Sequence, residues 1–551
     1  MLDINEYPWW QKGVIYQIYP RSFVDANGDG IGDLQGIIQR LVYLSGTLGV
    51  DAIWLSPIYP SPMADFGYDV ADYTNVDPQF GDLDDFDELV RSAHDRDLKI
   101  IVDFVPNHCS DQHAWFIESS SDKNNPKRDW FTWRDAKADG SPPNNWLSVF
   151  GGSAWEWHPA TEQYYLHSFL KEQPDLNWRN PQLKEAMFQV LRFWLDREVD
   201  GFRIDVAHFI MKDPELRDNP LKQVPSSDYH KPLGDYDSQI LLHSQNHADI
   251  HPLYREIRQL LDEFSLERPR LSVGEIHIFE WEKWAQYYGQ DLDELHMPMN
   301  FQLLGVDLQV DNIRQVVDSL EQVLPPGAWP NYVLGNHDEN RIASRYSEAG
   351  ARLAAMLLLT LRGTPTLYYG DEIGMLEAFI PPEQQQDPWG ISVPGLGRDG
   401  CRTPMQWNDQ PQAGFSPGDA SSAWLPINDN YRVTNVETQL RDHGSLLNLY
   451  RQLLSLRKSS PALQVGDFTQ IEPIHEHCYA YGRSLSGSPE YIVLLNFSAE
   501  ELSINMGLSG NGSLKVSTFL DREEVVDLAH LSLRKYEGVI VQIDGKEFPP
   551  G

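Results

Sequence analysis

The sequence predicts a (β/α)8 barrel with a subdomain inserted after its third strand and a C-terminal antiparallel β-sandwich domain. Short β-rich apolar runs alternate with amphipathic helical patterns through most of the 551 residues, which is typical of βα units around a parallel sheet. Polar residues stand at the ends of most expected strands, where the active sites of such barrels are built. The chain is therefore expected to be an enzyme.

Eight expected strands account for the barrel. Seven are clear apolar runs, and one further strand is needed to complete the count. In chain order the eight are Val14–Pro20, Asp51–Pro57, Lys99–Val105, Gly201–Val206, Leu271–Ile276, Met297–Leu303, Tyr332–Asp338 and Thr364–Gly370. Helical patterns lie between them, for instance at Asp85–Asp97 and Leu183–Glu198.

The barrel is expected to occupy residues 1–105 and 173–470. Residues 106–172 are rich in Trp, Asn, Asp, Pro and Gly and indicate an inserted subdomain. The Gly- and Pro-rich residues 376–425 follow the eighth strand and indicate a long lid-like loop. Residues 471–551 contain segments that alternate like half-buried antiparallel strands, so a separate β domain is expected there.

Composition narrows the classes of partner. The 44 basic and 81 acidic residues give a net charge of −37. Such a field repels phosphate backbones and anionic bilayers, so neither nucleic acid nor a membrane is an expected partner. The longest apolar runs fall far short of the ~20 residues that span a bilayer.

Cysteine usage indicates a reducing compartment. Cys109, Cys401 and Cys478 form neither a CxxC pair nor an even disulfide framework, which also argues against a zinc site or a catalytic thiol. The first ten residues have no basic segment followed by an apolar one, so no signal peptide is expected. We therefore expect a cytoplasmic protein.

Three acids stand at strand ends: Asp205, Glu275 and Asp338. Acids beside apolar strands are costly to bury without partners, so three in equivalent places indicate one shared site. Glycoside hydrolysis uses such a set, a carboxylate nucleophile opposite a carboxylic acid. Arg203 stands two residues before Asp205, on the same side of its strand. The alternative is that each acid only caps the following helix.

Motifs in order along the chain resemble the α-amylase family of retaining glycosidases (glycoside hydrolase family 13), in particular its α-glucosidase and oligo-1,6-glucosidase branch. Four segments resemble the family's main conserved regions: Asp103–His108, Gly201–Phe209, Val273–Ile276 and Asn336–Asp338. Supporting segments are Gly49–Pro57, Phe66–Tyr73, Gln173–Trp178, Gly363–Gly374 and Arg402–Trp407. The QPDLN form of Gln173–Asn177 resembles enzymes that act on small substrates.

This resemblance implies roles for individual residues. Asp205 is the implied nucleophile, Glu275 the general acid/base, and Asp338 the residue that binds sugar hydroxyls and stabilises the transition state. The residues implied to line the pocket around the terminal glucose are Asp69, His108, Arg203, His337 and Arg402. Tyr68, Phe150 and Phe169 are expected as aromatic walls, although single aromatics also serve as core.

The segment Asp25–Asp33 predicts a structural metal site. Oxygen donors at Asp25, Asn27, Asp29 and Asp33, with the Ile31 carbonyl, have the spacing that hard cations use. In the glucosidases that it resembles, this loop holds Ca²⁺ or Mg²⁺ away from the chemistry. The alternative is an acidic surface turn without metal.

The resemblance leaves the linkage open. Val206 follows the implied nucleophile, and Val there goes with preference for α-1,6 links, whereas Ala or Thr goes with α-1,4. We expect an exo-acting retaining α-glucosidase on short neutral α-glucosides, with possible transglucosylation; the alternative is an oligo-1,6-glucosidase. A non-catalytic transporter-associated relative is a remote alternative, because it would lack these acids. A monomer or a homodimer is expected.

Overall fold

The computed structural model describes residues 4–227, 229, 231–417, 422–472 and 474–543. Its centre is a closed barrel of eight parallel strands in the order β1-β11-β10-β9-β8-β7-β3-β2. The strands are β1 (Ile15–Ile18), β2 (Ala52–Leu55), β3 (Lys99–Phe104), β7 (Gly201–Ile204), β8 (Leu271–Gly274), β9 (Met297–Asn300), β10 (Asn331–Val333) and β11 (Thr364–Tyr368). The predicted barrel is confirmed. Seven of the expected strands contain one of these, and Tyr332–Asp338 overlaps β10, which begins one residue earlier and ends at Val333.

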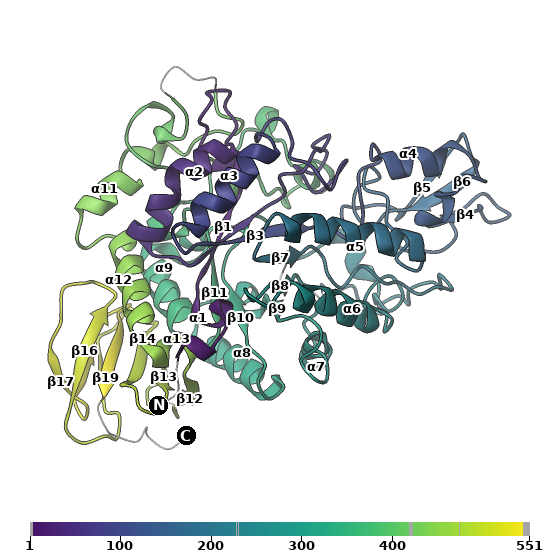
Figure 1. Cartoon of the computed structure of the whole chain (residues 1–551). Coiled ribbons are helices and arrows are strands. Elements are labelled where there is room, and N and C mark those ends of the chain that lie inside the picture. The colour runs from purple at the N-terminus through teal and green to yellow at the C-terminus, as the bar shows by residue number, and fades with distance from the viewer. Residues whose placement is uncertain (1–3, 228, 230, 418–421, 473, 544–551) are drawn as a thin grey trace.

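Helices surround the barrel (Figure 1). They are α2 (Leu34–Val42), α3 (Leu83–His94), α5 (Pro181–Asp196), α6 (Ile250–Glu263), α7 (Trp281–Ala285), α8 (Val310–Val323), α9 (Ile342–Thr360) and α12 (Leu446–Ser459). Local sequence sets where they begin. Asp82 starts α3 in a reciprocal capping box with Asp85, and Asn180 caps α5 with Pro181 at its first position.

The barrel strands are buried on both faces, as parallel strands covered by helices must be. Their inward residues form a compact apolar plug that includes Ile15, Trp54, Val273 and Met297. Their outward residues join the large core beneath the helices. This plug closes the barrel from within and leaves the carboxyl rim of the strands for the site.

Residues 106–172 form the expected excursion between β3 and α5. They contain α4 (Ala114–Ser121) and a three-stranded sheet of β4 (Trp133–Arg134), β5 (Trp155–His158) and β6 (Gln163–Leu166), in the order β4-β6-β5. In Figure 1 this part projects from one side of the barrel. Its segment 147–170 returns to the rim, because Val149, Phe150 and Phe169 line the cavity described below.

The C-terminal domain has two antiparallel sheets. One has the order β12-β13-β14-β19-β16-β17, and the other pairs β15 with β18. Their strands are β12 (Asp467–Gln470), β13 (Cys478–Ser484), β14 (Glu490–Asn496), β15 (Leu502–Ile504), β16 (Asn511–Ser517), β17 (Val525–Asp527), β18 (Leu531–Leu533) and β19 (Gly538–Ile543). Apolar side chains from both sheets share one core, including Leu494, Ile504, Leu531 and Val541.

The boundary of this domain differs from the sequence-based one. We placed residues 467–470 in the barrel domain, but they form β12, which pairs antiparallel with β13 from Asp467↔Ser484 onward. The barrel part ends with α13 (Pro461–Val465). The short strand lacks a buried face of its own, since its residues are half-buried or exposed. Its apolar pattern therefore could not assign it to a sheet.

Candidate active site

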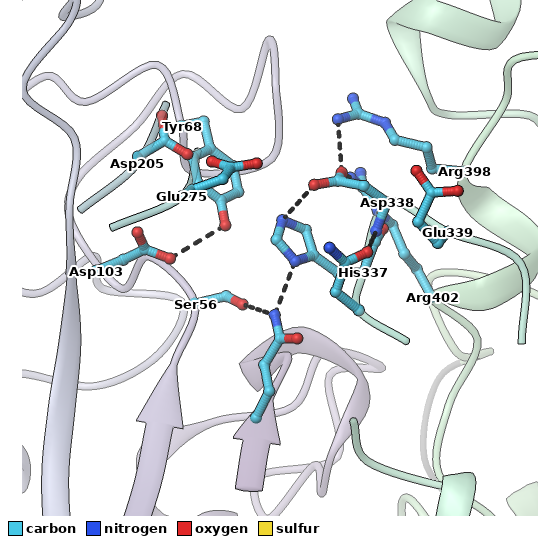
Figure 2. A network of polar contacts seen from close by, with 12 residues as sticks. Ser56, Tyr68, Asp103, Asp205, Glu275, His337, Asp338, Glu339, Arg398 and Arg402 are labelled. Atoms are coloured by element: carbon cyan, nitrogen blue, oxygen red, sulfur yellow. Dashed lines mark hydrogen bonds and ion pairs between the residues drawn. The ribbon is translucent and has the colours of Figure 1, made fainter. Parts of the chain in front are cut away.

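The three acids predicted at strand ends lie around one cavity at the carboxyl rim of the barrel (Figure 2). Asp205 directly follows β7, Glu275 directly follows β8, and Asp338 stands five residues after β10. Parallel strands of a closed barrel end at the same rim, so these acids meet although 133 residues separate the first from the last. The alternative that each acid only caps the following helix does not hold, because all three line the cavity.

Arg203 holds two of these acids together. It is 1% exposed, and its Nη1 lies 2.8 Å from Asp205 Oδ1 and 2.8 Å from Asp103 Oδ1. Its Nη2 lies 2.6 Å from Glu275 Oε2. Asp205 and Glu275 are therefore neighbours on one guanidinium, and one positive charge faces three carboxyl groups.

This imbalance changes the acidity of the cluster. Burial raises the pKa of Asp103 to about 6 although Arg203 opposes it. Burial also raises the pKa of Asp205 well above its ordinary value, and the charge of Glu275 adds to the effect. Glu275 behaves differently, because Arg203 and His277 outweigh burial and lower its pKa. Three carboxyl groups around one cation thus hold a shared proton more tightly than free carboxyl groups do.

Asp338 lies among cations instead. Its Oδ1 is 3.0 Å from Arg398 Nη1 and 2.9 Å from Arg402 Nη2, and its Oδ2 is 3.3 Å from His337 Nε2. Burial raises the pKa of Asp338, but these neighbours outweigh burial and hold it well below its usual range. Asp338 is therefore ionised, whereas the Arg203 cluster holds its proton more tightly.

The two predicted histidines are neutral. Burial lowers the pKa of His108 to about 4 and that of His337 to about 3. Gln17 Nε2 lies 2.7 Å from His337 Nδ1. Because an amide nitrogen can only donate, Nδ1 accepts and Nε2 carries the ring proton, on the side of Asp338. Both rings line the cavity.

The predicted aromatic walls lie at the cavity. Tyr68 stacks on His337, with ring centroids 5.3 Å apart and planes 1° from parallel, and its hydroxyl donates to Asp103 Oδ2 at 3.1 Å. Phe150 and Phe169 meet edge to face at 5.8 Å on the opposite wall. The two phenylalanines thus form part of the cavity wall and are not only residues of the hydrophobic core.

Three residues that we placed in the pocket from the sequence do not line it: Asp69, Arg203 and Arg402. Arg203 is buried and forms ion pairs with Asp205 and Glu275 instead. The Asp69 carboxylate is 0% exposed and accepts from Ser61 and from the backbone N–H groups of Ala64 and Asp65. Arg402 lies behind the cavity, where it holds Asp338 and the His337 carbonyl. The prediction that Asp69, Arg203 and Arg402 line the pocket is therefore wrong.

Asp65 lines the cavity in place of Asp69, and Arg398 lines it in place of Arg402. Arg398 Nη2 lies 2.8 Å from Asp65 Oδ1 and 2.7 Å from Asp387 Oδ1. Each stands four residues before the residue that we chose, in a loop, and is of the same type. The sequence contains no periodic signal that separates the members of such a pair.

Sequence reasoning also missed further lining residues. They share no motif, because they come from loops after β3, β7, β8, β10 and β11. They are Val149, Phe209, Tyr229, Lys231, His277, Glu339 and Trp389. Trp389 and Arg398 belong to the expected lid-like region 376–425, which therefore reaches the site.

Comparison with known proteins agrees with this geometry. The family described as "Alpha amylase, catalytic domain" matches residues 17–466. The chain belongs to the α-amylase family. A probable alpha-glucosidase of Rhizobium meliloti (strain 1021) is 43% identical over 534 residues, which cover 94% of this chain and 95% of that protein.

Two further relatives cover nearly the whole of this α-amylase family member. An oligo-1,6-glucosidase of Parageobacillus thermoglucosidasius is 36% identical and covers 97% of this chain and 99% of its own. The crystal structure of an alpha-glucosyl transfer enzyme superposes with a TM-score of 0.91 at 41% identity, over 97% of this chain and 99% of that one. The barrel, the insertion and the C-terminal sheets thus recur together.

The predicted metal loop of this α-amylase family member is ordered by its own backbone. Asp25 accepts from Gly28 N and Gly30 N, and Asp33 accepts from Ala26 N and caps α2 through Gly36 N. Among the described residues, no three His, Cys, Asp or Glu side chains are gathered as metal ligands. The oxygen donors predicted from the sequence include an amide and a carbonyl, so the donor chemistry still suits a hard cation.

The charge balance around Arg203 predicts the pH dependence of this family member. Asp103→Asn removes one negative charge beside Asp205 and Glu275, so the remaining carboxyls lose their proton more readily. In the pH profile of kcat/KM for maltose, we expect the alkaline limb to move to lower pH by about one pH unit. Asp95→Asn, which removes an exposed charge far from the cluster, is the control. An unchanged limb for Asp103→Asn would contradict the shared proton.

Proposed function

We propose that this protein is an exo-acting retaining α-glucosidase that releases glucose from the non-reducing end of short α-glucosides. The observation that carries the proposal is the pair of ion pairs that Arg203 forms with Asp205 and Glu275. These ion pairs hold Asp205 and Glu275 side by side at one end of a cavity, as a nucleophile and an acid must be in a retaining enzyme. Relatives named alpha-glucosidase and oligo-1,6-glucosidase support the substrate class.

The proposed reaction has two steps. In the reactive form the proton shared by the Arg203 cluster lies on Glu275. The Asp205 carboxylate attacks the anomeric carbon while Glu275 protonates the departing oxygen, and a covalent glucosyl-enzyme forms. Glu275 then takes a proton from water, which attacks the same carbon and releases glucose. An alcohol in place of water gives transglucosylation. The ionised Asp338 faces the cavity and can stabilise the positive charge that develops on the ring.

The closed end of the cavity supports exo action. Arg398 joins Asp65, Asp338 and Asp387 by ion pairs, and its guanidinium lies over Phe150 and Trp389. These groups come from four separate loops and form a wall behind the sugar site. A long chain could not thread past that wall, so only a terminal glucose can reach Asp205.

A substrate panel tests the proposal. Maltose, isomaltose, sucrose and kojibiose are assayed for glucose release, and soluble starch is assayed for viscosity and for glucose. We expect free glucose from the start with at least one disaccharide, and little reaction with starch. A fall of starch viscosity well before glucose appears would overturn the exo assignment. No glucose from any of the four disaccharides would overturn the glucosidase assignment.

Oligo-1,6-glucosidase is the second candidate, and Val206 favours it. Val206 lines the cavity beside Asp205 and has φ of 35°, a strained value for a β-branched residue. Val206→Thr is expected to raise kcat/KM for maltose relative to isomaltose by about tenfold, because it alters one side-chain group against the bound glucoside. Measuring the two substrates in parallel checks this. An unchanged ratio would remove Val206 as a determinant of linkage.

We further propose that Asp25–Asp33 holds a structural Ca²⁺ or Mg²⁺, supported by its five oxygen donors. A cation that binds only the folded state adds stability by mass action. Excess chelator should therefore lower Tm by roughly a few degrees. The activity per folded molecule should not fall. Asp29→Asn, which leaves the caps made by Asp25 and Asp33, should lose that sensitivity. An unchanged Tm, with no metal by elemental analysis, would refute the site.

A cytoplasmic location is part of the same proposal. Cys109, Cys401 and Cys478 are free and buried, which suits a reducing compartment. Among the described residues, no helix has the length and apolar character needed to cross a bilayer. We expect a monomer or a homodimer, which size-exclusion chromatography with light scattering distinguishes.

A further inference from the structure

His277 is the residue of the cavity wall that contacts the proposed acid directly. It stands two residues after Glu275, and its Nε2 lies 2.9 Å from Glu275 Oε1. Its ring lies between Phe301, at 4.3 Å and 12° from parallel, and Tyr229, at 5.2 Å and 28°. The imidazole is therefore held in one plane by stacking on both faces.

The hydrogen bonds of Glu275 leave one direction open. Oε2 accepts from Val206 N at 2.8 Å and forms an ion pair with Arg203 Nη2 at 2.6 Å, so both of its sides are occupied. The tight turn that gives Val206 its positive φ brings that N–H to the carboxylate. Oε1 has His277 on one lone pair and one direction left. A proton for the leaving group can therefore reside only on Oε1.

The other nitrogen of the ring indicates its tautomer. His277 Nδ1 is buried and has no hydrogen-bond partner among the described residues. A carboxylate can only accept, so in the ionised state of Glu275 the ring proton must lie on Nε2. Nδ1 is then the unprotonated nitrogen, which costs less to bury without a partner than an N–H does. The structure therefore indicates that Nε2 donates its proton to the hydrogen bond with Oε1.

The groups around His277 allow this state. Besides Glu275, the titratable side chains that face the ring are Tyr229 and His208, the latter 6.1 Å away between ring centroids. Burial lowers the pKa of His208 to about 3, so it stays neutral. Phe301 covers one face without any charge. The remaining charges near Glu275 are those of the Arg203 cluster and of Asp338.

We propose that His277 is a positioning residue for Glu275, which fixes the carboxyl plane and stabilises the carboxylate left after proton donation. This rests on the proposed function. As the bond from the anomeric carbon to the leaving oxygen breaks, its electron pair goes to that oxygen, which takes the proton from Oε1. Asp205 forms the new bond to the carbon. His277 keeps its own proton throughout, and Glu275 regains one from water in the second step.

Two variants separate the hydrogen bond from the packing. His277→Phe keeps an aromatic ring between Tyr229 and Phe301 but has no donor. His277→Gln keeps an N–H donor of similar reach but loses the stacked ring. Circular dichroism and Tm establish that both variants fold. The substrates are maltose, whose leaving group needs a proton, and 4-nitrophenyl α-glucoside, whose leaving group does not.

For His277→Phe we expect the pH-independent kcat/KM for maltose to fall about tenfold or more, with less than about a threefold fall for the nitrophenyl glucoside. The alkaline limb should move up by about one pH unit, because a carboxylate without its donor holds its proton more tightly. His277→Gln should recover both the maltose rate and the limb in large part.

The outcomes are distinguishable. Equal losses on both substrates with an unmoved alkaline limb would overturn the proposal and leave His277 as a filler of the wall. Failure of His277→Gln to recover either quantity would overturn it too. If wild-type protein releases glucose from neither substrate, the proposed function itself fails, and the role of His277 fails with it.

Discussion

Asp205→Asn is expected to lower kcat on maltose by about four orders of magnitude, because the amide cannot form the covalent glucosyl-enzyme. The fold should persist, since Asn has nearly the same shape and the change removes one of three carboxyls around Arg203. Burial raises the pKa of Asp205, which means that the folded state disfavours its charge. Replacing the carboxyl with a neutral amide therefore should not destabilise the fold. Tm should therefore fall little or rise.

Product stereochemistry and chemical rescue check the same assignment. Proton NMR of the wild-type reaction should give α-glucose as the first anomer, because two displacements restore the configuration. Asp205→Ala supplied with azide should form β-glucosyl azide, since a small anion can enter the space of the lost carboxylate and attack once. Near-native turnover by Asp205→Asn, or β-glucose as the first wild-type product, would show that Asp205 is not the nucleophile.

Asp65→Asn is expected to lower kcat/KM for maltose by about 10³-fold. The Asp65 carboxylate lines the cavity and accepts from Arg398. A carboxylate has enough lone pairs to accept from a sugar hydroxyl as well. A site built to hydrogen-bond a hydroxyl loses orders of magnitude when one partner is mismatched. Initial rates over a range of maltose concentrations measure the effect.

Asp69→Asn is the matched control, because it changes the same group four residues away. Asp69 holds the turn through Ser61 and two backbone N–H groups and does not reach the cavity. Burial raises its pKa to about 6. We expect a change in Tm and a kcat/KM within about threefold of wild type for the folded fraction. The reverse pattern would restore Asp69 as the sugar ligand and exclude Asp65.

Much of the architecture followed from patterns that repeat along the chain. Apolar runs bounded by polar residues located seven of the eight strands, because a buried parallel strand must be apolar on both faces. The strand at Met297–Leu303 was expected because a closed barrel of this class needs eight. The acids at the ends of Gly201–Ile204 and Leu271–Gly274 could be assigned to one rim, because a closed parallel barrel brings all its strand ends together. The family and the three acids at the rim were therefore accessible from the sequence.

The sequence could not show which of two similar loop residues faces the cavity. Asp65 and Asp69, and likewise Arg398 and Arg402, are pairs of one residue type four positions apart in irregular segments. Which member faces the cavity depends on partners far along the chain, such as Gln173, which donates to Asp65 at 3.2 Å. Loop residues have no periodicity that fixes where a side chain points.

The contact between His277 and Glu275 shows the same division. The sequence placed Glu275 at the rim through its strand, but nothing in the following residues indicated that His277 turns back to its carboxylate. That geometry comes from Tyr229 and Phe301, which stack on the imidazole from two other loops. The sequence by itself determined the barrel and its acids, since these depend on local periodicity and on closure. Only the tertiary structure decided which side chains surround those acids, since that depends on packing between distant segments.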